Sequence, residues 1–330
     1  MINNYFKNKS ILITGGTGSF GKAIIKFFIK NKFPVRKLVI FSRDELKQYE
    51  MSESYNQYKD SKLRFFIGDV RDKDRLKLAF DDIDIVIHAA ALKQVPTAEY
   101  NPLEFIKTNI LGAQNIIEAS LDTNVQKVIA LSTDKASSPV NLYGATKLCS
   151  DKLFVSANNM VGKKKLRFSV VRYGNVMGSR GSVLHKFLEQ KKTGFINLTH
   201  PDMTRFNITL EESIKMVLWS LVNSFGGEIF VPKIPSFRLI DLAKAVCSKC
   251  KIKITSIRPG EKLHEEMISI YDSRTTIDLK NYYTILPENL IEKYLKLKFK
   301  LVKEGFNYRS DTNDDFLNVN QLKIIIKEFI

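Results

Sequence analysis

Tyr143 and Lys147 are four residues apart and form a pair that could perform chemistry together. On a helix, residues at this spacing lie on one face, so a phenol and an ammonium group could address the same reacting atom. The pKa of a free tyrosine is about 10, and a neighbouring cation lowers it toward the range in which the phenol acts as a base. Such a spacing is common in helices, and it indicates proton transfer only together with a cofactor site.

Thr133, Asp134 and Lys135 form a second group, directly after a short apolar run. A carboxyl group can protonate a departing hydroxyl group, and an amine can exchange a proton with carbon. For Lys135 to act as a base, burial or neighbouring cations would have to lower its pKa from about 10.4, whereas contact with Asp134 would raise it. Taken alone, Lys135 is better explained as a solvated loop residue or as an ion-pair partner of Asp134.

A glycine-rich turn supplies the cofactor site that these groups would need. Gly15, Gly18 and Gly21 follow the apolar residues 11–13 and precede a helical pattern. In this context the first glycine permits a tight turn, the second lets backbone N–H groups approach a pyrophosphate, and the third lets the helix pack against the strand. The amino end of the helix then faces the phosphates. The turn therefore predicts a nicotinamide dinucleotide site.

The residues after the second expected strand predict which dinucleotide is bound. An NAD-binding protein places a carboxylate there for the ribose hydroxyl. Here Ser42 and Arg43 occupy that position, and Lys47 lies one helical turn further on. A hydroxyl group and two cations suit a 2′-phosphate, which favours NADP over NAD, although Asp44 could still bind an unmodified ribose. Asp69, after the third expected strand, is placed to meet the adenine.

The elements that would position these groups alternate between β-branched apolar runs and amphipathic stretches, as in βαβ units. Several runs are apolar throughout, which is typical of parallel strands covered on both faces. The expected strands are residues 11–14, 38–41, 64–67, 85–88, 128–131 and 168–172. The expected helices include residues 20–30, 72–80, 102–121 and 142–158. The fold class is therefore α/β, with a doubly wound parallel sheet of about six strands of the Rossmann type.

The alternation ends after about residue 175. Thr209 and Glu212 form a capping box that opens a helix. A short strand and another helix follow at residues 229–231 and 239–250. We expect residues 1–175 to form the cofactor-binding domain with the catalytic groups. Residues 176–330 should form mainly a smaller substrate-binding region, with segments that could return to the sheet.

The composition fits a globular protein. The 330 residues are 44% hydrophobic, and no apolar run approaches the roughly 18 residues that span a membrane. No secretory leader precedes the first expected strand, and three cysteines cannot form a disulfide framework, so we expect a cytoplasmic protein. Cys247 and Cys250 are expected to serve ordinary packing. No metal site is expected, because the cysteines and histidines show no ligand spacing.

The net charge of +17 admits three explanations. It could serve nucleic acid, anionic small molecules, or neither, if lysine is simply abundant in the proteome. The lysines are dispersed and are not interleaved with a base-stacking module. The charge pattern therefore favours small anions over nucleic acid.

Together these motifs resemble the extended short-chain dehydrogenase/reductase superfamily. The likeness is carried by the glycine turn together with Asp69, Ala89, Ala90, Asn109, Tyr143 and Lys147. Within this superfamily, many sugar 4,6-dehydratases carry Thr-Asp-Glu where this chain has Thr133-Asp134-Lys135. The lysine resembles the inverting UDP-N-acetylglucosamine 4,6-dehydratases, which begin pseudaminic acid synthesis. The resemblance extends from about residue 8 to residue 313 and includes residues 42–47, 172–176, 178–182 and 258–262.

The resemblance implies a sequence of steps. Tyr143, helped by Lys147 and Thr133, takes the proton of the sugar 4-hydroxyl while hydride passes to NADP. A base removes the proton from C5, and Asp134 protonates the departing C6 hydroxyl. The hydride returns to C6, so the cofactor stays bound and is regenerated in each turnover. If Lys135 delivers the last proton from the opposite face, C5 is inverted.

The resemblance also implies the binding residues. The cofactor would contact Gly15, Thr17, Gly18, Ser19, Phe20, Gly21, Ser42, Arg43, Asp44, Glu45, Leu46, Lys47, Asp69, Val70, Ala89, Ala90, Lys93, Thr108, Asn109, Tyr143, Lys147 and Val176. The UDP-sugar would contact Lys93, Tyr143, Asn175, Arg180, Gly181, Ser182, Val183, Arg205, Arg258 and Glu261. The planar guanidinium groups suit a pyrophosphate. A homo-oligomer is also implied, with a hexamer as one form, and no nucleic-acid or membrane partner is expected.

Other functions stay open at this point. A sister group that makes precursors of N-acetyl-fucosamine shares many motifs, and Gln94 stands where the pseudaminic group would carry histidine, whereas Tyr143 favours the pseudaminic group. A nucleotide-sugar C4 epimerase would have no need of Asp134 and Lys135. An NADP-binding regulator would not need an intact Tyr143/Lys147 pair. A nucleic-acid-binding protein would show steep salt-dependent binding without sugar turnover.

Overall fold

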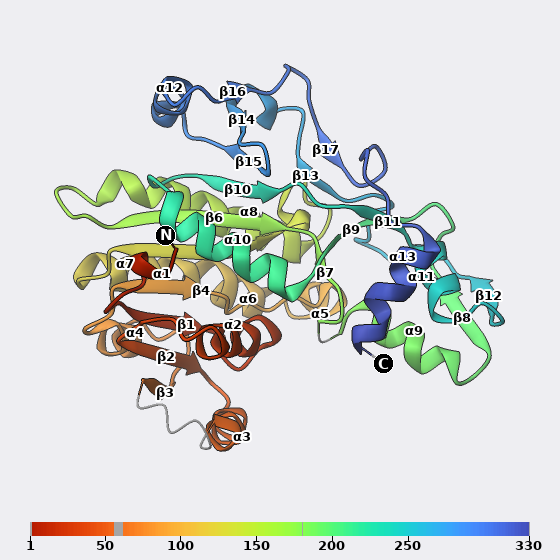
Figure 1. Ribbon diagram of the computed structural model, residues 1–330, viewed down its shortest axis with the longest axis horizontal. Helices are drawn as coiled ribbons and strands as arrows, with labels where there is room; N and C mark the ends of the chain where they lie inside the picture. Colours follow the sequence, from red (N-terminus) through yellow and green to blue (C-terminus); the bar gives the residue numbers. More distant parts are fainter. Residues whose placement is uncertain (1, 56–61, 180, 330) are drawn as a thin grey trace.

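A large mixed sheet organises the structure, a computed structural model that describes residues 2–55, 62–179 and 181–329. Its strands lie in the order β16-β14-β15-β10-β6-β5-β4-β1-β2-β3 (Figure 1). Neighbours from β10 to β3 are parallel, and β14, β15 and β16 extend the sheet antiparallel beyond β10. These strands are β1 (Ser10–Thr14), β2 (Lys37–Ser42), β3 (Leu63–Ile67), β4 (Ile85–His88), β5 (Lys127–Thr133), β6 (Arg167–Tyr173), β10 (Ile229–Pro232), β14 (Thr276–Asp278), β15 (Tyr282–Ile285) and β16 (Lys300–Leu301).

All six strands expected from the sequence are present, which confirms the doubly wound α/β fold. Every residue of β1 and β4 is buried, as parallel strands covered on both faces require. The sequence left open whether segments beyond residue 175 return to this sheet, and the strand at 229–231 does so, because β10 pairs parallel with β6. The chain beyond residue 175 therefore contributes both to the sheet and to the smaller region next to it.

Helices cover both faces of the sheet. In Figure 1, α2 and α10 lie in front of it, and α4, α7 and α8 lie behind. The helices are α1 (Ile2–Tyr5), α2 (Ser19–Lys30), α3 (Glu45–Tyr55), α4 (Lys73–Phe80), α5 (Val95–Tyr100), α6 (Pro102–Phe105), α7 (Gly112–Asp122), α8 (Leu142–Ser156), α9 (Val183–Lys191), α10 (Leu210–Asn223), α11 (Leu239–Val246), α12 (Glu288–Lys296) and α13 (Val319–Ile326). The capping box of Thr209 and Glu212 is formed at the start of α10, as expected.

The helix expected at residues 102–121 is interrupted by a π-helical segment, Ile106–Leu111, between α6 and α7. Such segments widen one turn and often lie at functional sites. Here the turn contains Asn109, which is buried. The Asn109 side chain bonds both the N–H and the C=O of Leu92, at 2.9 Å each, and so fixes the chain that follows β4.

The smaller region lies beside the carboxyl ends of the parallel strands (Figure 1). It has its own core, formed by residues such as Leu184, Phe187, Leu198, Phe237, Leu242 and Leu322. The short strands that lie outside the large sheet pair as β11-β9-β7, β12-β8 and β13-β17. They are β7 (Asn175–Val176), β8 (Phe195–Leu198), β9 (Thr204–Ile208), β11 (Ser236–Arg238), β12 (Lys251–Ile254), β13 (Glu266–Ile268) and β17 (Tyr308–Arg309).

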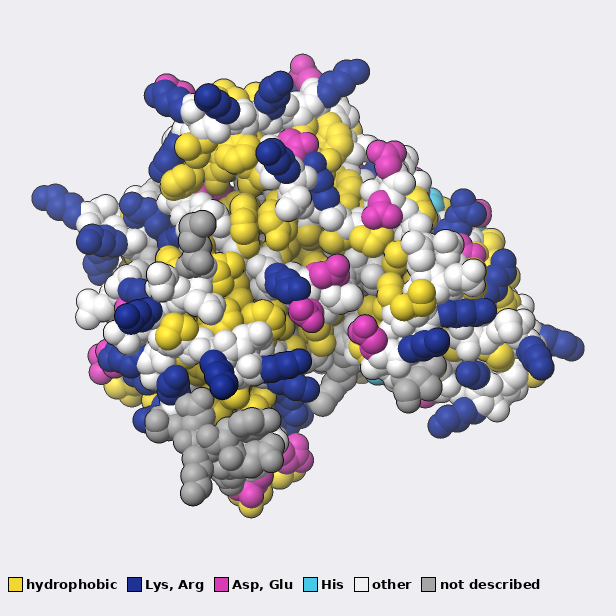
Figure 2. All heavy atoms as spheres, viewed as in Figure 1, with side chains coloured by type: hydrophobic (Ala, Val, Ile, Leu, Met, Phe, Trp, Pro, Cys, Tyr) yellow, Lys and Arg dark blue, Asp and Glu magenta, His cyan; other side chains and the backbone are white. Residues whose placement is uncertain are grey.

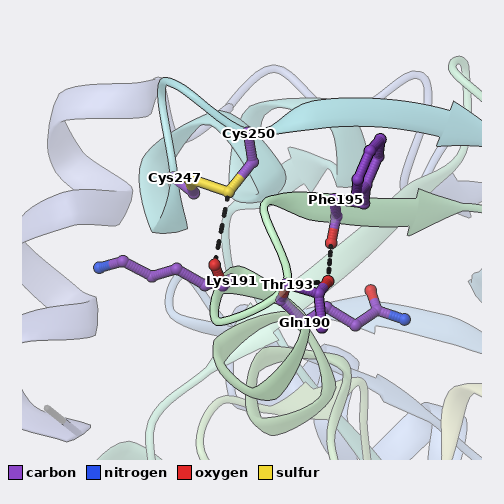
Figure 3. The surroundings of a disulfide bond; sticks show 6 residues. All are labelled: Gln190, Lys191, Thr193, Phe195, Cys247 and Cys250. Atoms are coloured by element: carbon purple, nitrogen blue, oxygen red, sulfur yellow. Dashed lines mark hydrogen bonds between the residues drawn. A yellow bond between two sulfur atoms is a disulfide. The ribbon is translucent and has the colours of Figure 1, made fainter.

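Cys247 and Cys250 form a disulfide bond, so the expectation that both thiols serve ordinary packing is wrong (Figure 3). The reason is local: α11 ends at Val246, Cys247 is extended, and the following turn brings the two Cα atoms to 5.4 Å. This separation lies within the range that a disulfide bridges. The Cys250 sulfur also lies 3.9 Å from the carbonyl oxygen of Lys191, at the end of α9. Cys149 is a free, exposed thiol.

The positive charge of the surface is not concentrated in one patch on the face that Figure 2 shows. Lys and Arg side chains are spread over this face, with Asp and Glu side chains between them. Among the described residues, no helix is long and apolar enough to cross a membrane.

Glu228 connects the parallel sheet to its antiparallel extension. Its fully buried carboxylate accepts hydrogen bonds from the Ser169 hydroxyl at 2.7 Å and from the Tyr294 hydroxyl at 3.1 Å. The backbone N–H groups of Phe225 and Gly226 donate to it as well, at 2.5 and 2.9 Å. One carboxylate thus joins β6, the turn before β10, and α12.

Replacing Glu228 by glutamine should destabilise the fold. The amide keeps the shape but places a donor against these donors and removes charge-assisted hydrogen bonds, so the free energy of unfolding should fall by about 1–3 kcal/mol. Urea unfolding followed by circular dichroism measures the change. The control is Glu304→Gln, because Glu304 is 76% exposed and forms an ion pair with Arg274 at the surface; a change below about 0.5 kcal/mol is expected there. Equal losses in both variants would refute the role of Glu228.

Candidate active site

A cavity of about 370 Å³ lies at the carboxyl ends of β1 to β4. It is lined by Gly15, Thr17, Gly18, Phe41, Ser42, Arg43, Asp44, Lys47, Gly68, Asp69, Val70, Ala89, Ala90, Ala91 and Thr108. The sequence assigned most of these residues to a dinucleotide. In a doubly wound sheet this edge, next to the point where the strand order reverses, is where dinucleotides bind.

The glycine turn fits a dinucleotide because its backbone lies so close to neighbouring backbone that a side chain at these positions would collide with it. Gly15 has φ +64°, and a Cβ there would lie 2.9 Å from the backbone of Ala90. A Cβ at Gly21 would lie 2.3 Å from the carbonyl oxygen of Gly16, so only glycine lets α2 pack this close to the turn. The backbone N–H groups and the amino end of α2 remain directed at the position that a pyrophosphate takes.

Thr14 and His88 fix the other wall of this cavity. The Thr14 hydroxyl oxygen accepts hydrogen bonds from the N–H groups of Ala89 at 3.1 Å and Ala90 at 3.2 Å. With both lone pairs used, the hydroxyl must donate its own proton to Nδ1 of His88, 2.8 Å away. His88 is therefore neutral, with its proton on Nε2. Burial lowers the pKa of His88 to about 3, and the charge of Lys147 acts in the same direction.

The adenosine end of the cavity carries opposite charges. Arg43 lies 3.6 Å from Oδ2 of Asp69, its side chain 52% exposed, and Lys47 pairs with Asp44. Burial acts to raise the pKa of Asp69, but hydrogen bonds from Arg71 and the charge of Arg43 hold this pKa below its ordinary value. Ser42 is buried, and Nε2 of Gln48 donates to its hydroxyl oxygen at 3.0 Å. Arg43 is thus the cation best placed to reach a ligand here.

Other residues assigned to the cofactor do not line this cavity: Ser19, Phe20, Gly21, Glu45, Leu46, Lys93, Asn109, Tyr143, Lys147 and Val176. Gly21 and Asn109 position the backbone around the cavity instead. Leu46 is 61% exposed.

Tyr143 and Lys147 lie on the first turns of α8, whose N-cap Asn141 accepts a hydrogen bond from the Gly144 N–H at 2.8 Å. Both side chains are buried. The expected lowering of the Tyr143 pKa by Lys147 is not found. Burial raises this pKa to about 12, opposed by the charge of Lys135 and by a hydrogen bond with Thr133. Lys147 Nζ instead donates to the carbonyl oxygen of Leu131 at 2.9 Å, and burial lowers its pKa.

Asp134 and Lys135 lie at the end of β5, and Lys135 contacts Glu265, a residue that was not predicted from the sequence. Lys135 Nζ is 3.1 Å from Oδ1 of Asp134 and 2.8 Å from Oε1 of Glu265. Both carboxyl groups are 1% exposed, whereas the Lys135 side chain is 23% exposed. The Thr133 hydroxyl donates to Oδ1 of Asp134 at 2.9 Å.

The pKa of Lys135 is raised, so the lowering that a basic amine needs is not present. Burial acts to lower this pKa, but the charges of Asp134 and Glu265 outweigh it. A lysine held in its charged form is a proton donor. In this form Lys135 can give up a proton but cannot accept one.

A second cavity, of about 280 Å³, lies between the strand ends and the smaller region. Of the residues expected to contact the UDP-sugar, it is lined by Lys93, Asn175, Gly181, Ser182, Val183, Arg205, Arg258 and Glu261. Lys135 and Glu265 are also part of its wall. Tyr143 is not part of that wall, and Arg180 lies outside the described residues.

Arg205 has little capacity left for a ligand. Its guanidinium donates to the carbonyl oxygens of Thr204, Lys262 and Leu263 at 2.7 to 3.1 Å, and it lies 3.6 Å from both Glu261 and Glu265. Its side chain is 6% exposed. Arg205 therefore holds the segment around residues 261–265 in place.

Sequence reasoning missed Glu265 because it is 130 positions from Lys135. Arg258 to Lys262 were recognised as a motif, and two glutamates follow three residues later. The sequence offers no local signal that distinguishes the two glutamates; the structure shows that Glu265 is buried and Glu266 is partly exposed. A buried glutamate requires a partner, and Lys135 is one candidate.

The fold and the two cavities define an extended short-chain dehydrogenase/reductase. A glycine turn faces one cavity, a Tyr-x-x-x-Lys pair begins the helix after β5, and a separate region covers the strand ends. The family of polysaccharide biosynthesis proteins matches residues 11–287, and the chain belongs to this family.

Three known proteins are similar to the chain. UDP-N-acetylglucosamine 4,6-dehydratase (inverting) from Campylobacter jejuni subsp. jejuni serotype O:23/36 (strain 81-176) is 54% identical, over 97% of this chain and 98% of its own. UDP-glucose 4-epimerase from Rickettsia bellii (strain OSU 85-389) is 45% identical, over 85% and 83%. The X-ray structure of Pen from Bacillus thuringiensis has a TM-score of 0.88 at 36% identity and covers 98% of this chain and 99% of that one. The resemblance to the inverting dehydratases, inferred from the motifs, is thus confirmed.

Neutral His88 should make the fold sensitive to acid. Its folded pKa of about 3 lies below the ordinary value near 6.5, so stability is fully present above about pH 6.5 and is lost as the pH falls toward 3. In that window the loss attributable to His88 approaches about 1.4 kcal/mol per pH unit. Urea unfolding at a series of pH values should show a shallower slope for His88→Asn, which keeps an acceptor near the Nδ1 position. The control His200→Gln should keep the wild-type slope, and a steep slope in His88→Asn would contradict the assignment.

Proposed function

We propose that the chain is an NADP-dependent UDP-N-acetylglucosamine 4,6-dehydratase that inverts C5. The product would be UDP-2-acetamido-2,6-dideoxy-β-L-arabino-hex-4-ulose. The observation that carries the proposal is the contact of Asp134 and Lys135 at the end of β5, with Lys135 in the wall of the second cavity. An acid and a charged amine at this place supply the two protons that elimination and inversion require. The 54% identical relative, named as an inverting dehydratase, supports the proposal.

The cofactor proposal rests on the first cavity. When bound, the nicotinamide supplies a reversible hydride acceptor. The glycine turn would hold the pyrophosphate, and Asp69 would lie near the adenine. Arg43 would pair with a 2′-phosphate, because its side chain is 52% exposed and, in the described part of the chain, faces one carboxylate, that of Asp69, at 3.6 Å. This arrangement favours NADP, although Asp44 could serve the ribose of NAD.

Tyr143 would take the proton of the 4-hydroxyl group as a phenolate, which requires a cation, such as the oxidised nicotinamide, to lower the pKa that burial raises. Its hydroxyl is hydrogen-bonded to Thr133, and Thr133 donates to Asp134. The same hydrogen-bonded series therefore connects the group that gains a proton to the acid that loses one. Lys147 would orient this end of α8, since its ammonium is fixed on the Leu131 carbonyl oxygen of β5.

Asp134 and Lys135 would act on C6 and C5. Once C4 is a ketone, the C5 proton is acidic and a base can remove it. Asp134 then gives its proton to the C6 oxygen, which leaves as water. Burial and the charge of Glu265 raise the pKa of Asp134, which favours the protonated form that this step needs. Lys135, charged, would return a proton to C5 from the opposite face.

We assign substrate binding mainly to residues 176–330. Arg258 is exposed in the wall of the second cavity and would pair with the pyrophosphate, together with Lys93. Asn175 and Ser182 line the same cavity. The resemblance further implies a homo-oligomer, and sedimentation velocity would measure its size. It also implies that the reaction takes place in the cytoplasm and that the product enters pseudaminic acid synthesis.

A C4 epimerase is the second candidate, because the 45% identical relative carries the name UDP-glucose 4-epimerase. An epimerase oxidises and reduces C4 and leaves C5 and C6 unchanged. Release of water from C6 therefore separates the two functions in one assay.

The central experiment is incubation of the purified protein with UDP-N-acetylglucosamine and NADP in D₂O, followed by NMR. A 4-keto-6-deoxy product with deuterium at C5 and the L-configuration is expected. Absence of such a product would exclude the dehydratase. A deuterated product with the D-configuration would exclude only the role of Lys135. Isomerisation at C4 without loss of water would support the epimerase.

Replacing Lys135 by methionine should lower formation of the inverted product by roughly 10²–10⁴-fold, the usual contribution of a general acid. Transient reduction of NADP should persist, because the groups that act at C4 remain. The control is Lys152→Met, which removes an exposed lysine from α8. Undiminished turnover of Lys135→Met, with the cofactor bound, would remove this residue from the mechanism.

Arg43→Ala tests the cofactor. The dissociation constant for NADP should rise roughly 10-fold or more, since a charged hydrogen bond contributes about 1.5–3 kcal/mol, while that for NAD should change little. Fluorescence titration measures both. Arg64→Ala, on β3, is the matched control, because Arg64 lies outside the cavity wall. Equal weakening of NAD and NADP in Arg43→Ala would contradict recognition of a 2′-phosphate.

A further inference from the structure

Glu265 is a buried carboxylate in the wall of the second cavity, and its position is rigid. It directly precedes β13, and its backbone is bonded on both sides to Ser310. The Glu265 N–H donates to the Ser310 hydroxyl at 2.9 Å, and the Ser310 N–H donates to the Glu265 carbonyl oxygen at 2.8 Å. The pairing of β13 with β17 therefore holds this carboxylate against the end of β5.

Glu265 is closer to cations than Asp134 is. Its Oε1 lies 2.8 Å from Lys135 Nζ and 3.6 Å from Nε of Arg205. Among the residues that the structure describes, Asp134 contacts one cation, Lys135, at 3.1 Å, and accepts a hydrogen bond from Thr133. Oδ2 of Asp134 and Oε2 of Glu265 have no hydrogen-bond partner among the described residues.

This difference decides which carboxyl group carries the proton. If both were ionised, two negative charges would share one ammonium group in a site where each carboxyl is 1% exposed. A proton on Asp134 removes this repulsion and leaves Glu265 to pair with Lys135 and Arg205.

We propose that Glu265 is a positioning residue that provides the counter-charge of Lys135, so that Asp134 can keep the proton that it gives to the C6 hydroxyl. Without Glu265, Asp134 would be the only carboxylate in contact with Lys135. It would then ionise and could no longer serve as the acid. The inference rests on the proposed dehydratase function, because that reaction is what requires a neutral carboxyl group here.

The pKa directions agree with this arrangement. Burial raises the pKa of Asp134, the charge of Glu265 raises it further, and Lys135 opposes both. Burial acts on Glu265 in the same direction, but the charges of Lys135 and Arg205 outweigh it and lower its pKa. The pKa values of the two neighbouring carboxyl groups are thus shifted in opposite directions, as at many acid–base sites.

Other charged groups around the cluster come from several elements. Lys262 lies before β13 and donates from Nζ to the carbonyl oxygen of Ser137 at 2.6 Å; burial lowers its pKa. Glu261 faces Arg205 at 3.6 Å, and Glu266 accepts hydrogen bonds from the Ser138 hydroxyl. These three residues remain in every variant used below.

The test is the pH dependence of kcat in Glu265→Gln, measured as release of the 4-keto-6-deoxy product. The alkaline limb, where Asp134 loses its proton, should move to lower pH by about one unit or more. Activity should recover at the acid end, and transient reduction of NADP should persist throughout. Glu265→Asp, which restores the negative charge, should move the limb back toward the wild type.

A purely structural role for Glu265 would lower kcat by the same factor at every pH, and that result would overturn the inference. Glu228→Gln is the matched control, because it removes an equally buried carboxylate on a different side of the molecule; it should leave the alkaline limb in place. If Glu265→Gln does not fold, infrared spectra of the wild type decide the question. A band of a protonated carboxyl group at neutral pH that disappears in Asp134→Asn is expected, and its absence would refute the proposal.

The two proposals can fail separately. If the wild-type protein makes no 4-keto-6-deoxy sugar, the dehydratase function fails, while the infrared band still reports the charge arrangement. If the product forms and the alkaline limb of Glu265→Gln coincides with that of the wild type, only the role of Glu265 fails.

Discussion

A lysine held between two buried carboxyl groups is the constraint on which the catalytic half of this structure depends. Removing an ion from water costs several kcal/mol, and a buried charge is tolerated only when it is paired. Lys135 comes from the end of β5, Glu265 from the segment before β13, and Arg205 from β9. None of these segments can bury its charge alone. The site is therefore complete only when the C-terminal segments are packed on the strand ends.

The cofactor half is built differently. Its closest backbone contacts are of two kinds. One lies within a strand–turn–helix unit, where Gly21 lets α2 lie against Gly16, and the other lies between neighbouring strands, where Gly15 lies against Ala90. Such contacts depend on local sequence and on the order of parallel strands, not on partners far along the chain. The same difference explains what could be predicted. The parallel strands of the Rossmann half and most of the first cavity followed from apolar runs and glycine spacing, because both signals are local.

What the sequence could not provide depends on long-range contacts and on burial. Arg205 was expected to bind substrate because arginines suit pyrophosphates, but its donors are used on backbone carbonyls. The Lys147 cation was expected to lower the pKa of Tyr143, but the ammonium is directed at Leu131. β10 could not be assigned to the main sheet, since its pairing with β6 has no local signal. The disulfide of Cys247 and Cys250 depends on the position where α11 ends, and helix ends are the least predictable part of an element.

The proton on Asp134 has a second consequence, for the charge that faces the substrate. With Asp134 neutral, Lys135 is in contact with one carboxylate, that of Glu265, instead of two, so more of its positive charge is left to face the substrate. Loss of the C5 proton next to a C4 ketone places negative charge on the substrate as an enolate. A fixed positive charge in a site of low polarity stabilises such an anion more than water does. An ionised Asp134 would cancel that charge before the reaction began. A protonated Asp134 would therefore serve both as the acid for the C6 hydroxyl and as the condition under which Lys135 favours the enolate.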